Sequence, residues 1–304
     1  MASASRPTVL IVGGTGFVGA HLKAHMDASY RVFAVGQDHD VRKPEAMMSL
    51  VADSMPGFVV NLASITTVRE SFDDPARCYQ IGFLGTLHLL QALEAHQFCG
   101  TFLNVSSSEV YGHPSAEELP LREESSMRPM SPYAVCKVAA ESLCFQWSQS
   151  APFSLVTARP FTHIGPGQST RFAISNFAKQ LSEIRAGRRS SDIGVGDLDT
   201  TRDFTDVRDI VRAYELLLHS GRNGESYNVC SGRETRMRDA LDQLIAEAGV
   251  SVTTRMDPSL ARTQQQQRML GDYTKLHRDT GWRPLIPMRE TLRDTIAHWA
   301  DTLR

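Results

Sequence analysis

Residues 8–19 read TVLIVGGTGFVG, an apolar strand that runs directly into a glycine-rich turn, and this stretch decides the fold. The β-branched run Thr8–Val12 is typical of a buried strand, and residues 20–27 are compatible with a helix. Glycines spaced by three at such a turn let the backbone approach a pyrophosphate, which then lies at the helix N-terminus. The stretch therefore predicts a nucleotide-binding strand, turn and helix at the start of the chain.

Strand and helix patterns alternate after this turn, which predicts an α/β fold: a doubly wound parallel sheet of Rossmann type with helices on both faces. We expect further strands at 31–35, 57–62, 101–106 and 153–159 and long helices at 75–95 and 132–148. Beyond residue 160 the pattern is mixed α/β, with helices expected at 171–186, 207–219, 236–248 and 288–303 and short strands at 226–229 and 251–255.

The composition fits a water-soluble enzyme rather than a nucleic-acid-binding or membrane protein. The 304 residues are 41% hydrophobic, which is enough for one large core, and the net charge of −2 offers no nucleic-acid surface. No apolar run approaches the ~20 residues of a membrane span, and the opening MASASRP lacks the apolar segment of a signal peptide. The five cysteines are odd in number and lack metal-ligand spacing, so we expect a cytoplasmic protein with reduced thiols and no metal.

The main chemical signal is the pentapeptide YAVCK at 133–137, which Ser107 precedes in the stretch VSSSEVYG. A tyrosine is a poor acid–base catalyst at neutral pH because its ordinary pKa is about 10. Lys137 follows Tyr133 by one helical turn, where its positive charge would stabilise the phenolate. A serine hydroxyl can hold a substrate oxygen against the tyrosine. Ser107, Tyr133 and Lys137 thus predict proton transfer at an oxygen whose carbon gives or takes a hydride.

Together these features resemble the extended short-chain dehydrogenases/reductases that act on nucleotide sugars. Further stretches match that family in order along nearly the whole chain: NLAS at 61–64, SSSEVYG at 106–112, SPYAVCK at 131–137, ARPFTH at 158–163 and RDFTDV at 202–207. Within the family, the chain looks most like the GDP-4-keto-6-deoxy-D-mannose reductases, which form GDP-D-rhamnose. This closer match uses HIGPGQ at 163–168, YNVCSG at 227–232 and the short path from the second strand to NLAS.

The resemblance implies a domain organisation and a set of cofactor-binding residues. Residues 1–160 would form an NAD(P)-binding Rossmann domain, to which the chain returns around 202–228, and residues 161–304 mainly a smaller nucleotide-sugar lobe. The glycine-rich turn would hold the pyrophosphate and the pair Asp40–Val41 the adenine ring. The implied cofactor-binding set is Gly13, Thr15, Gly16, Phe17, Val18, Gly19, Asp40, Val41, Leu62, Ala63, Ser64, Tyr133, Lys137 and Pro160.

The end of the second strand favours NADPH, with NADH as the alternative. NAD enzymes usually place an acidic residue there to bind the ribose 2′-hydroxyl, where it would repel a 2′-phosphate. Here the expected position is Gly36 or Gln37 and is uncharged, while Asp38 comes slightly late. Arg42 and Lys43 lie nearby in the sequence.

The substrate residues follow from the resemblance to enzymes of GDP-linked deoxy-sugars. Arg202 stands where relatives hold the diphosphate, and Arg262 stands where GDP-sugar relatives carry a second phosphate-binding arginine. A guanidinium suits this because its planar donor fork grips phosphate oxygens in pairs. The full implied substrate set is Thr66, Ser107, Ser108, Glu109, Thr162, Arg202 and Arg262.

The chain departs from the family pattern at three positions. Gln265 stands where GDP-sugar relatives often have glutamate, and Thr162 replaces an asparagine that often contacts substrate phosphate. Gly82 replaces an asparagine in the helix at 75–95, where a glycine costs about 1 kcal/mol relative to alanine and would mark close helix packing.

Four functions share these residues. A reductase needs Tyr133 to protonate O4, and its product would be the rhamnose or the 6-deoxy-talose form. A GDP-mannose 4,6-dehydratase would add Glu109 as an acid/base group, but such relatives have a longer insertion after the second strand than Gly36–Asp40 provides. A 4- or 5-epimerase would use the same residues. A non-catalytic nucleotide sensor would not need to retain Ser107, Tyr133 and Lys137 together.

The two helices at 75–95 and 132–148 also predict how the protein assembles. Both carry more apolar residues than one face against the sheet can use: Ile81, Leu84, Leu87, Leu90, Val138, Ala139 and Leu143. Family members pair these helices across a two-fold axis. We therefore expect a homodimer, or a dimer of dimers, formed through a four-helix bundle.

Overall fold

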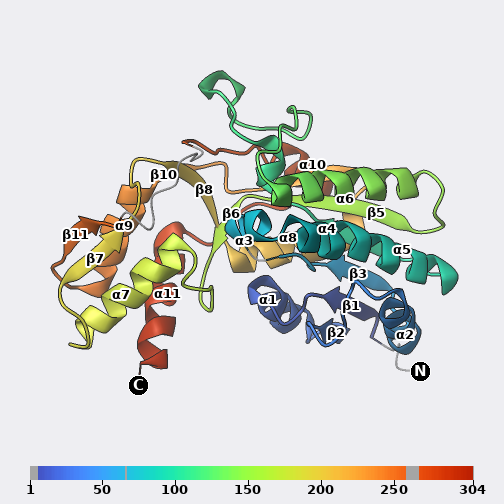
Figure 1. Cartoon of the computed structure of the whole chain (residues 1–304), viewed down its shortest axis with the longest axis horizontal. Coiled ribbons are helices and arrows are strands. Elements are labelled where there is room, and N and C mark those ends of the chain that lie inside the picture. Colours follow the sequence, from blue (N-terminus) through green and yellow to red (C-terminus); the bar gives the residue numbers. More distant parts are fainter. Residues whose placement is uncertain (1–5, 66, 258–266, 304) are drawn as a thin grey trace.

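The computed structural model describes residues 6–65, 67–257 and 267–303, which form a large and a small lobe (Figure 1). The large lobe is built on a six-stranded parallel sheet in the order β2-β1-β3-β4-β5-β9. Its strands are β1 (Thr8–Val12), β2 (Arg31–Val35), β3 (Phe58–Asn61), β4 (Thr101–Val105), β5 (Ser154–Pro160) and β9 (Ser226–Val229). The Rossmann-type sheet predicted from the sequence is confirmed. The strand order reverses between β1 and β3, the point where such sheets bind ligands at the carboxyl ends of their strands.

Helices cover both faces of the sheet because successive residues of its strands point to opposite sides. In β1, Val9 and Ile11 belong to one core and Leu10 and Val12 to the other. The first core is covered by α1 (Phe17–Met26), α8 (Val207–Ser220) and α10 (Thr274–Thr280). The second is covered by α2 (Pro44–Ser54), α5 (Gly85–Ala95) and α6 (Pro132–Ser148).

The long helix expected at 75–95 is present with those bounds, but it contains a π-helical turn. The segment consists of α4 (Pro75–Tyr79), a π-helical turn η1 (Gln80–Leu84) and α5, and it follows the short helix α3 (Val68–Asp73). Thr86 Oγ1 donates to the carbonyl oxygen of Gly82 at 2.7 Å, a side-chain bond of the kind that interrupts regular helix turns. A Cβ at Gly82 would lie 2.5 Å from Cys136 Sγ on α6. The glycine therefore lets the two helices pack closely.

After β5 the chain leaves the sheet and later returns to it. It passes through β6 (Thr162–Ile164), and it comes back through β8 (Thr201–Asp206), α8 and β9. Strand β8 pairs with β6 in parallel and with β10 (Glu234–Arg236) antiparallel. This three-stranded sheet lies between the two lobes (Figure 1).

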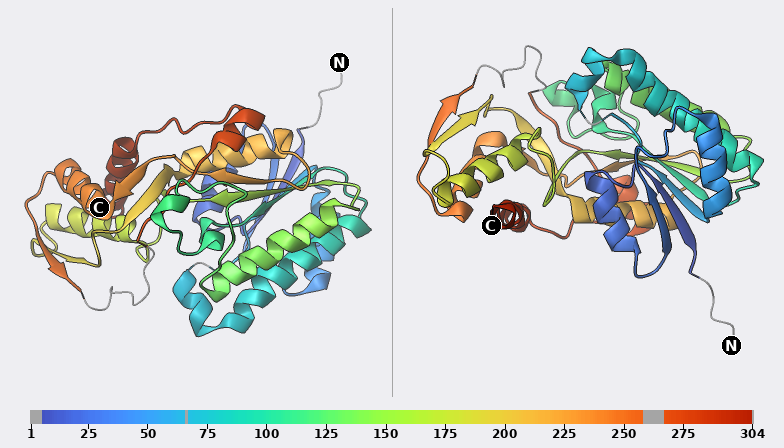
Figure 2. Two further views of the ribbon diagram at one scale, coloured as in Figure 1. Left: turned by 90° about the horizontal axis from the view of Figure 1, so that it is seen from above. Right: turned by 60° about the horizontal axis from the view of Figure 1, so that its bottom comes forward.

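The small lobe has its own apolar core among three helices. These are α7 (Ala173–Arg185), α9 (Met237–Ala248) and α11 (Met288–Thr302). A parallel ribbon of β7 (Asp192–Val195) and β11 (Thr253–Met256) lies beside them. Helices α7 and α11 lie together in both views of Figure 2, where Ser182 Oγ donates to the carbonyl oxygen of Ile296 at 3.3 Å.

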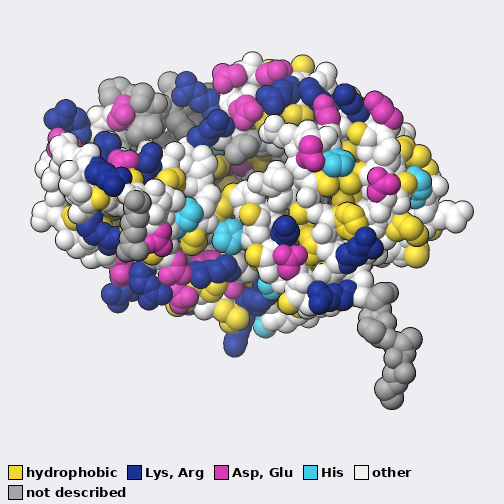
Figure 3. All heavy atoms as spheres, turned by 90° about the horizontal axis from the view of Figure 1, so that it is seen from below, with side chains coloured by type: hydrophobic (Ala, Val, Ile, Leu, Met, Phe, Trp, Pro, Cys, Tyr) yellow, Lys and Arg dark blue, Asp and Glu magenta, His cyan; other side chains and the backbone are white. Residues whose placement is uncertain are grey.

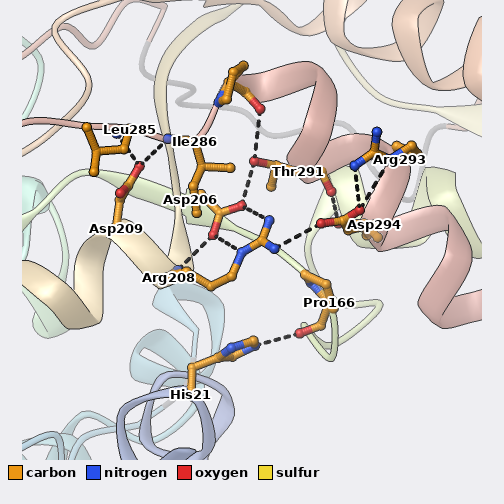
Figure 4. Close-up of polar contacts among 12 residues, drawn as sticks. His21, Pro166, Asp206, Arg208, Asp209, Leu285, Ile286, Thr291, Arg293 and Asp294 are labelled. Carbon is orange, nitrogen blue, oxygen red and sulfur yellow. Dashed lines mark hydrogen bonds and ion pairs between the residues drawn. The ribbon is translucent and has the colours of Figure 1, made fainter. Parts of the chain in front are cut away.

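A polar network joins the lobes where α8 begins (Figure 4). The Asp206 carboxylate accepts from the Arg208 guanidinium at 2.8 Å and from Thr291 Oγ1 at 2.6 Å. Arg208 also contacts Asp294 of α11 at 2.9 Å. The first turn of a large-lobe helix is thereby attached to the last long helix of the small lobe.

Three observations concern the surface charges, the helices and the polar clusters. Basic and acidic side chains are mixed over the face seen in Figure 3. Within the described ranges, no helix is both long and apolar enough to cross a membrane, and no group of three His, Cys, Asp or Glu side chains is arranged to hold a metal ion. All five cysteines are free thiols.

Candidate active site

The glycine-rich turn brings the backbone of three segments together at the carboxyl end of β1. Gly13 has a φ of 82°, and a Cβ there would lie 3.0 Å from the backbone of Leu62 and Ala63. A Cβ on Gly19 would lie 2.5 Å from Gly14 Cα, so α1 packs directly on the turn. Helix α1 begins at Phe17, and its first turn, with Val18 and Gly19, faces this loop without an acidic residue. The turn is thus shaped for close approach of an anionic group.

The end of β2 lies beside the same turn. A Cβ on Gly36 would lie 2.4 Å from Thr15 Oγ1, which places the Thr15 hydroxyl at the tip of β2. The Asp38 carboxylate folds back to accept from the Gly36 amide at 3.0 Å and lies 2.9 Å from His39 Nδ1. A carboxylate therefore does stand at the end of β2, two residues later than the usual position.

The pair Asp40–Val41 is held by contacts of its own. Hydrogen bonds from the Arg42 guanidinium lower the pKa of Asp40 to about 2. The Val41 side chain is buried, and a Cβ on Gly85 would lie 2.6 Å from it. His88 Nδ1 lies 2.9 Å from the Val41 carbonyl oxygen, so α5 fixes this corner.

The stretch after β3 is fixed by α5 as well. The Leu62 amide donates to the Val12 carbonyl at 2.8 Å, which continues the sheet pairing past Asn61. Asn61 Nδ2 donates to Thr86 Oγ1 at 3.0 Å and its Oδ1 accepts from the Ala63 amide at 3.2 Å. Ser64 follows half-buried, whereas Thr66, predicted to touch the sugar, lies outside the described residues.

Ser107 follows β4 by two residues and is the N-cap of a short 3₁₀ helix, η2 (Ser108–Tyr111). Its Oγ accepts from the Glu109 amide at 3.2 Å, as an N-cap does. Ser108 is buried beneath it. The cap places Ser107 and Glu109 on the same turn at the carboxyl edge of the sheet.

Tyr133 and Lys137 lie in the first two turns of α6. The helix begins at Pro132, where Ser131 Oγ accepts from the Ala134 amide at 3.1 Å. Lys137 is buried, and its Nζ donates to the Val105 carbonyl oxygen at 2.7 Å, next to Ser107 on the chain. Ser107 lies close enough to Tyr133 for its hydroxyl to lower the pKa of the phenol. The three residues predicted to carry the chemistry are therefore in one place.

The electrostatics of Tyr133 differ from the expectation that Lys137 stabilises a phenolate. Burial raises the pKa of Tyr133 above its ordinary value; the hydroxyl of Ser107 opposes this shift, and the charge of Glu109 adds to it. Burial also lowers the pKa of Lys137. Loss of hydration therefore outweighs the neighbouring cation, and the tyrosine is a protonated phenol at neutral pH.

The ARPFTH stretch runs from the sheet to the small lobe. Pro160 is buried at the end of β5, and Thr162 starts β6 opposite Phe204 of β8. The His163 ring is stacked on Phe17 of α1 with centroids 6.2 Å apart. Burial lowers the pKa of His163, so the ring is neutral. His163 opens the HIGPGQ motif, but no role was predicted for it from the sequence.

A second contact joins α1 to this stretch. His21 Nε2 lies 2.8 Å from the Pro166 carbonyl oxygen (Figure 4). Together with the Phe17–His163 stack, it attaches the nucleotide-binding helix to the loop that leads into the small lobe.

Arg202, the predicted substrate-side cation that the structure describes, lies outside the six-stranded sheet. Arg202 is on β8, where its Nη1 donates to the Thr201 carbonyl oxygen at 2.7 Å. The next residue, Asp203, is fully buried and accepts from the amides of Ser231 at 2.7 Å and Gly232 at 2.9 Å. Arg262 and Gln265 lie outside the described residues.

The comparisons with known proteins agree with this geometry. The family model described as GDP-mannose 4,6 dehydratase matches residues 35–295. GDP-6-deoxy-D-mannose reductase of Pseudomonas aeruginosa is 42% identical over 97% of this chain and 98% of its own. The structure of RMD from Pseudomonas aeruginosa complexed with NADPH has a TM-score of 0.92 and 41% identity, over 97% of this chain and 99% of that one. GDP-mannose 4,6-dehydratase of Yersinia enterocolitica is 24% identical over 85% of this chain and 77% of its own.

Proposed function

Because this chain belongs to the extended short-chain dehydrogenases/reductases of nucleotide sugars, and matches their GDP-mannose 4,6 dehydratase family model, we propose that it is an NADPH-dependent GDP-sugar 4-ketoreductase. It reduces the C4 keto group of GDP-4-keto-6-deoxy-D-mannose and forms GDP-D-rhamnose. The observation that carries this function is the 42% identity, over nearly the full length of both chains, to a GDP-6-deoxy-D-mannose reductase.

The residues at the carboxyl edge of the sheet fit a nicotinamide dinucleotide. The turn at Gly13 and Gly14 leaves no room for a Cβ, so a phosphate can approach the backbone there. Thr15 and Gly36 meet at the tip of β2, where the adenosine ribose of such a cofactor lies. When bound, NADPH supplies a hydride to C4 of the sugar.

The proton for the new hydroxyl group comes from Tyr133. Ser107 lies close enough to Tyr133 to lower its pKa, so a keto oxygen placed between the two side chains can accept from both hydroxyl groups. The raised pKa keeps the phenol protonated until the oxygen becomes basic. The ammonium group of Lys137, held by the Val105 carbonyl, then stabilises the phenolate that remains. Lys137 is buried and Tyr133 is half-buried, which limits the access of water to the proton transfer.

The sugar nucleotide binds across the junction between the lobes in this proposal. Arg202 grips the diphosphate with its planar donor fork. Thr162, at the start of β6, contributes a hydroxyl donor near the reacting end of the substrate. Ser108 and Glu109 line the same edge through η2.

A dehydratase is the second candidate because of where Glu109 lies. Its charge acts on Tyr133, so its carboxylate is near the reacting phenol. A dehydratase uses a carboxylate there to remove the C5 proton, whereas a reductase does not need one. A reductase must also exchange its cofactor after every turnover.

One assay separates the two functions. The purified protein is given GDP-mannose, alone or with a separate dehydratase, and NADPH absorbance is followed. A reductase consumes NADPH only when the dehydratase is present, and NMR of the product then distinguishes rhamnose from 6-deoxy-talose. If the protein forms the 4-keto sugar from GDP-mannose without added reductant, it is a dehydratase and not a reductase.

The exposed apolar residues support a homodimer through α4, α5 and α6, which lie side by side in Figure 1. Of the residues predicted for this surface, Leu84 is exposed, but Leu90 lies in the core. Three others extend the exposed apolar face along both helices: Tyr79, Val135 and Phe145. The same helices of a second copy would present the same side chains across a two-fold axis.

A further inference from the structure

A buried ion pair lies one helical turn beyond Lys137. Glu141 follows Tyr133 and Lys137 at four-residue spacing on α6, so the three share one helix face. The Glu141 carboxylate accepts from Arg159 Nε at 3.0 Å and from Arg159 Nη2 at 2.7 Å, with both side chains only 6% and 5% exposed. Arg159 belongs to the end of β5.

The pair also contacts both ends of the segment that carries Ser107. Ser106 Oγ donates to Glu141 Oε1, and Arg159 Nη1 donates to the Tyr111 hydroxyl at 2.9 Å. The first and the last residue of this segment, Ser106 and Tyr111, therefore both bind the same bidentate ion pair. The pair joins α6, which carries Tyr133, to β5.

Two further contacts keep this arrangement in place. The Tyr111 hydroxyl donates to Asn228 Oδ1 of β9 at 2.7 Å. Arg159 Nη1 also donates to the Glu123 carbonyl oxygen at 2.8 Å. Burial opposes the charge of Arg159, yet the bonds to Glu141 raise its pKa overall, so the guanidinium stays charged. The segment is thus attached to two strands of the sheet, β5 and β9.

A buried ion pair adds little stability in general, because desolvation of the two charges offsets their attraction. The contacts of this pair instead reach the two parts of the chain that carry the reacting hydroxyl groups. These are α6, which carries Tyr133, and residues 106 to 111, which include Ser107. We propose that Glu141 and Arg159 are positioning residues that hold Ser107 against Tyr133. The inference rests on the proposed function, in which these two hydroxyl groups bind the keto oxygen.

The effect is on geometry rather than on binding of the cofactor. A displacement of about 1 Å at a reacting group can cost on the order of 10²-fold in rate. Glu141→Gln keeps the shape but weakens both the Arg159 and Ser106 contacts. We expect its kcat to fall by at least ~10-fold, with the KM for NADPH within about 2-fold of wild type. Ser106→Ala removes one contact only, and its kcat falls by a smaller factor in the same direction.

The control is a carboxylate of equal burial elsewhere. Asp209 on α8 accepts from Arg212 at 2.6 Å and from the amides of Leu285 at 2.8 Å and Ile286 at 2.9 Å. Asp209→Asn removes a buried charge and its bonds without touching residues 106 to 111. Its kcat in the folded state stays at the wild-type value.

Hydrogen exchange gives a readout that needs no substrate. The Ser106 amide donates to the Ala158 carbonyl at 2.8 Å and the Gly112 amide to that of Glu109 at 3.2 Å, so the segment is protected in the wild type. In Glu141→Gln and Ser106→Ala, amides 106 to 112 exchange faster while those of β1 do not change. Asp209→Asn leaves the segment protected.

Two results would overturn the positioning role: wild-type kcat together with unchanged exchange in both Glu141→Gln and Ser106→Ala, or an equal loss of kcat in Asp209→Asn. If Glu141→Gln does not fold, Ser106→Ala carries the test. If the wild-type protein reduces no keto sugar, the proposed function is refuted but the positioning role is not. Hydrogen exchange still tests whether Glu141 and Arg159 hold residues 106 to 111 in place.

Discussion

Lys137 Nζ lies 5.6 Å from the centroid of the Tyr133 ring and donates to the Val105 carbonyl oxygen, the last of β4. One cation thereby links the helix that carries the tyrosine to the end of β4, two residues before Ser107. It lies over the ring of the phenol. In the proposed mechanism, this cation stabilises the phenolate that remains after the proton has been donated.

Replacing the phenol should abolish proton donation without unfolding the site. Tyr133→Phe keeps the ring and removes the hydroxyl, so we expect kcat to fall by ~10²–10⁴-fold with NADPH binding little changed. Lys137→Ala should cost a comparable factor, since the phenolate loses its cation. Tyr30→Phe, a tyrosine bonded to His219 away from the site, is the matched control. Near-normal turnover of Tyr133→Phe would contradict the mechanism.

Neutralising Glu109 separates reduction from dehydration. Glu109→Gln should retain substantial 4-keto reduction, because the only proton required comes from Tyr133. Activity should also depend on added NADPH or NADH. The measurement is NADPH consumption with the 4-keto substrate, alongside product analysis with GDP-mannose alone. Abolished turnover in Glu109→Gln, with cofactor retained through purification, would favour the lyase.

Asp38 should restrain the use of NADPH. Its carboxylate is bonded to the Gly36 amide at the tip of β2, where it would repel a 2′-phosphate. Because the side chain is exposed, water screens the repulsion and the effect is small, roughly a 1.5- to 5-fold change. Asp38→Asn should therefore raise kcat/KM for NADPH relative to NADH by that factor. Asp53→Asn is the control for net charge, and an unchanged ratio in Asp38→Asn would argue against the repulsion.

Gly82 should not tolerate a side chain. Alanine would gain about 1 kcal/mol of helix propensity, but its Cβ would lie 2.5 Å from Cys136 Sγ. Overpacking of this kind costs about 1–3 kcal/mol, so Gly82→Ala should lower the free energy of unfolding. Removing the sulfur in the double variant with Cys136→Ala should recover part of the loss. The free energies of unfolding of the two single variants and the double variant, measured with denaturant, complete a double-mutant cycle. If the two single effects simply add in the double variant, the contact between Gly82 and Cys136 is refuted.

The apolar face of α5 and α6 should control assembly. Phe145 is 58% exposed on α6, and Phe145→Glu would place a charge in the proposed bundle. We expect the wild type to be a dimer, or a dimer of dimers, at micromolar concentration by light scattering, and the variant to dissociate. Met256→Glu changes an equally exposed residue on β11 and should leave the mass unchanged. A monomeric wild type would exclude the dimer.

The sequence by itself was sufficient for the parts of the fold that local chemistry encodes. The β-branched run before Gly13 predicts β1, and the glycine spacing predicts the tight turn into α1, because both depend on neighbouring residues only. The pairing of Tyr133 with Lys137 follows equally from helix periodicity. The elements α2, α10 and β7 were not predicted. Helix α10 and strand β7 are short, whereas α2 does carry buried residues at helical spacing, Met47, Leu50 and Val51, which could have indicated it.

Only the tertiary structure decided how those elements act on one another. That Glu141 and Arg159 form one buried pair depends on β5 lying beside α6, 18 residues away in the chain. The close contact at Gly82 depends on Cys136 approaching from another helix. The raised pKa of Tyr133 likewise reflects burial by the assembled lobe, against the expectation from Lys137 alone. Packing and desolvation are properties of the whole arrangement, so no local pattern of residues contains them.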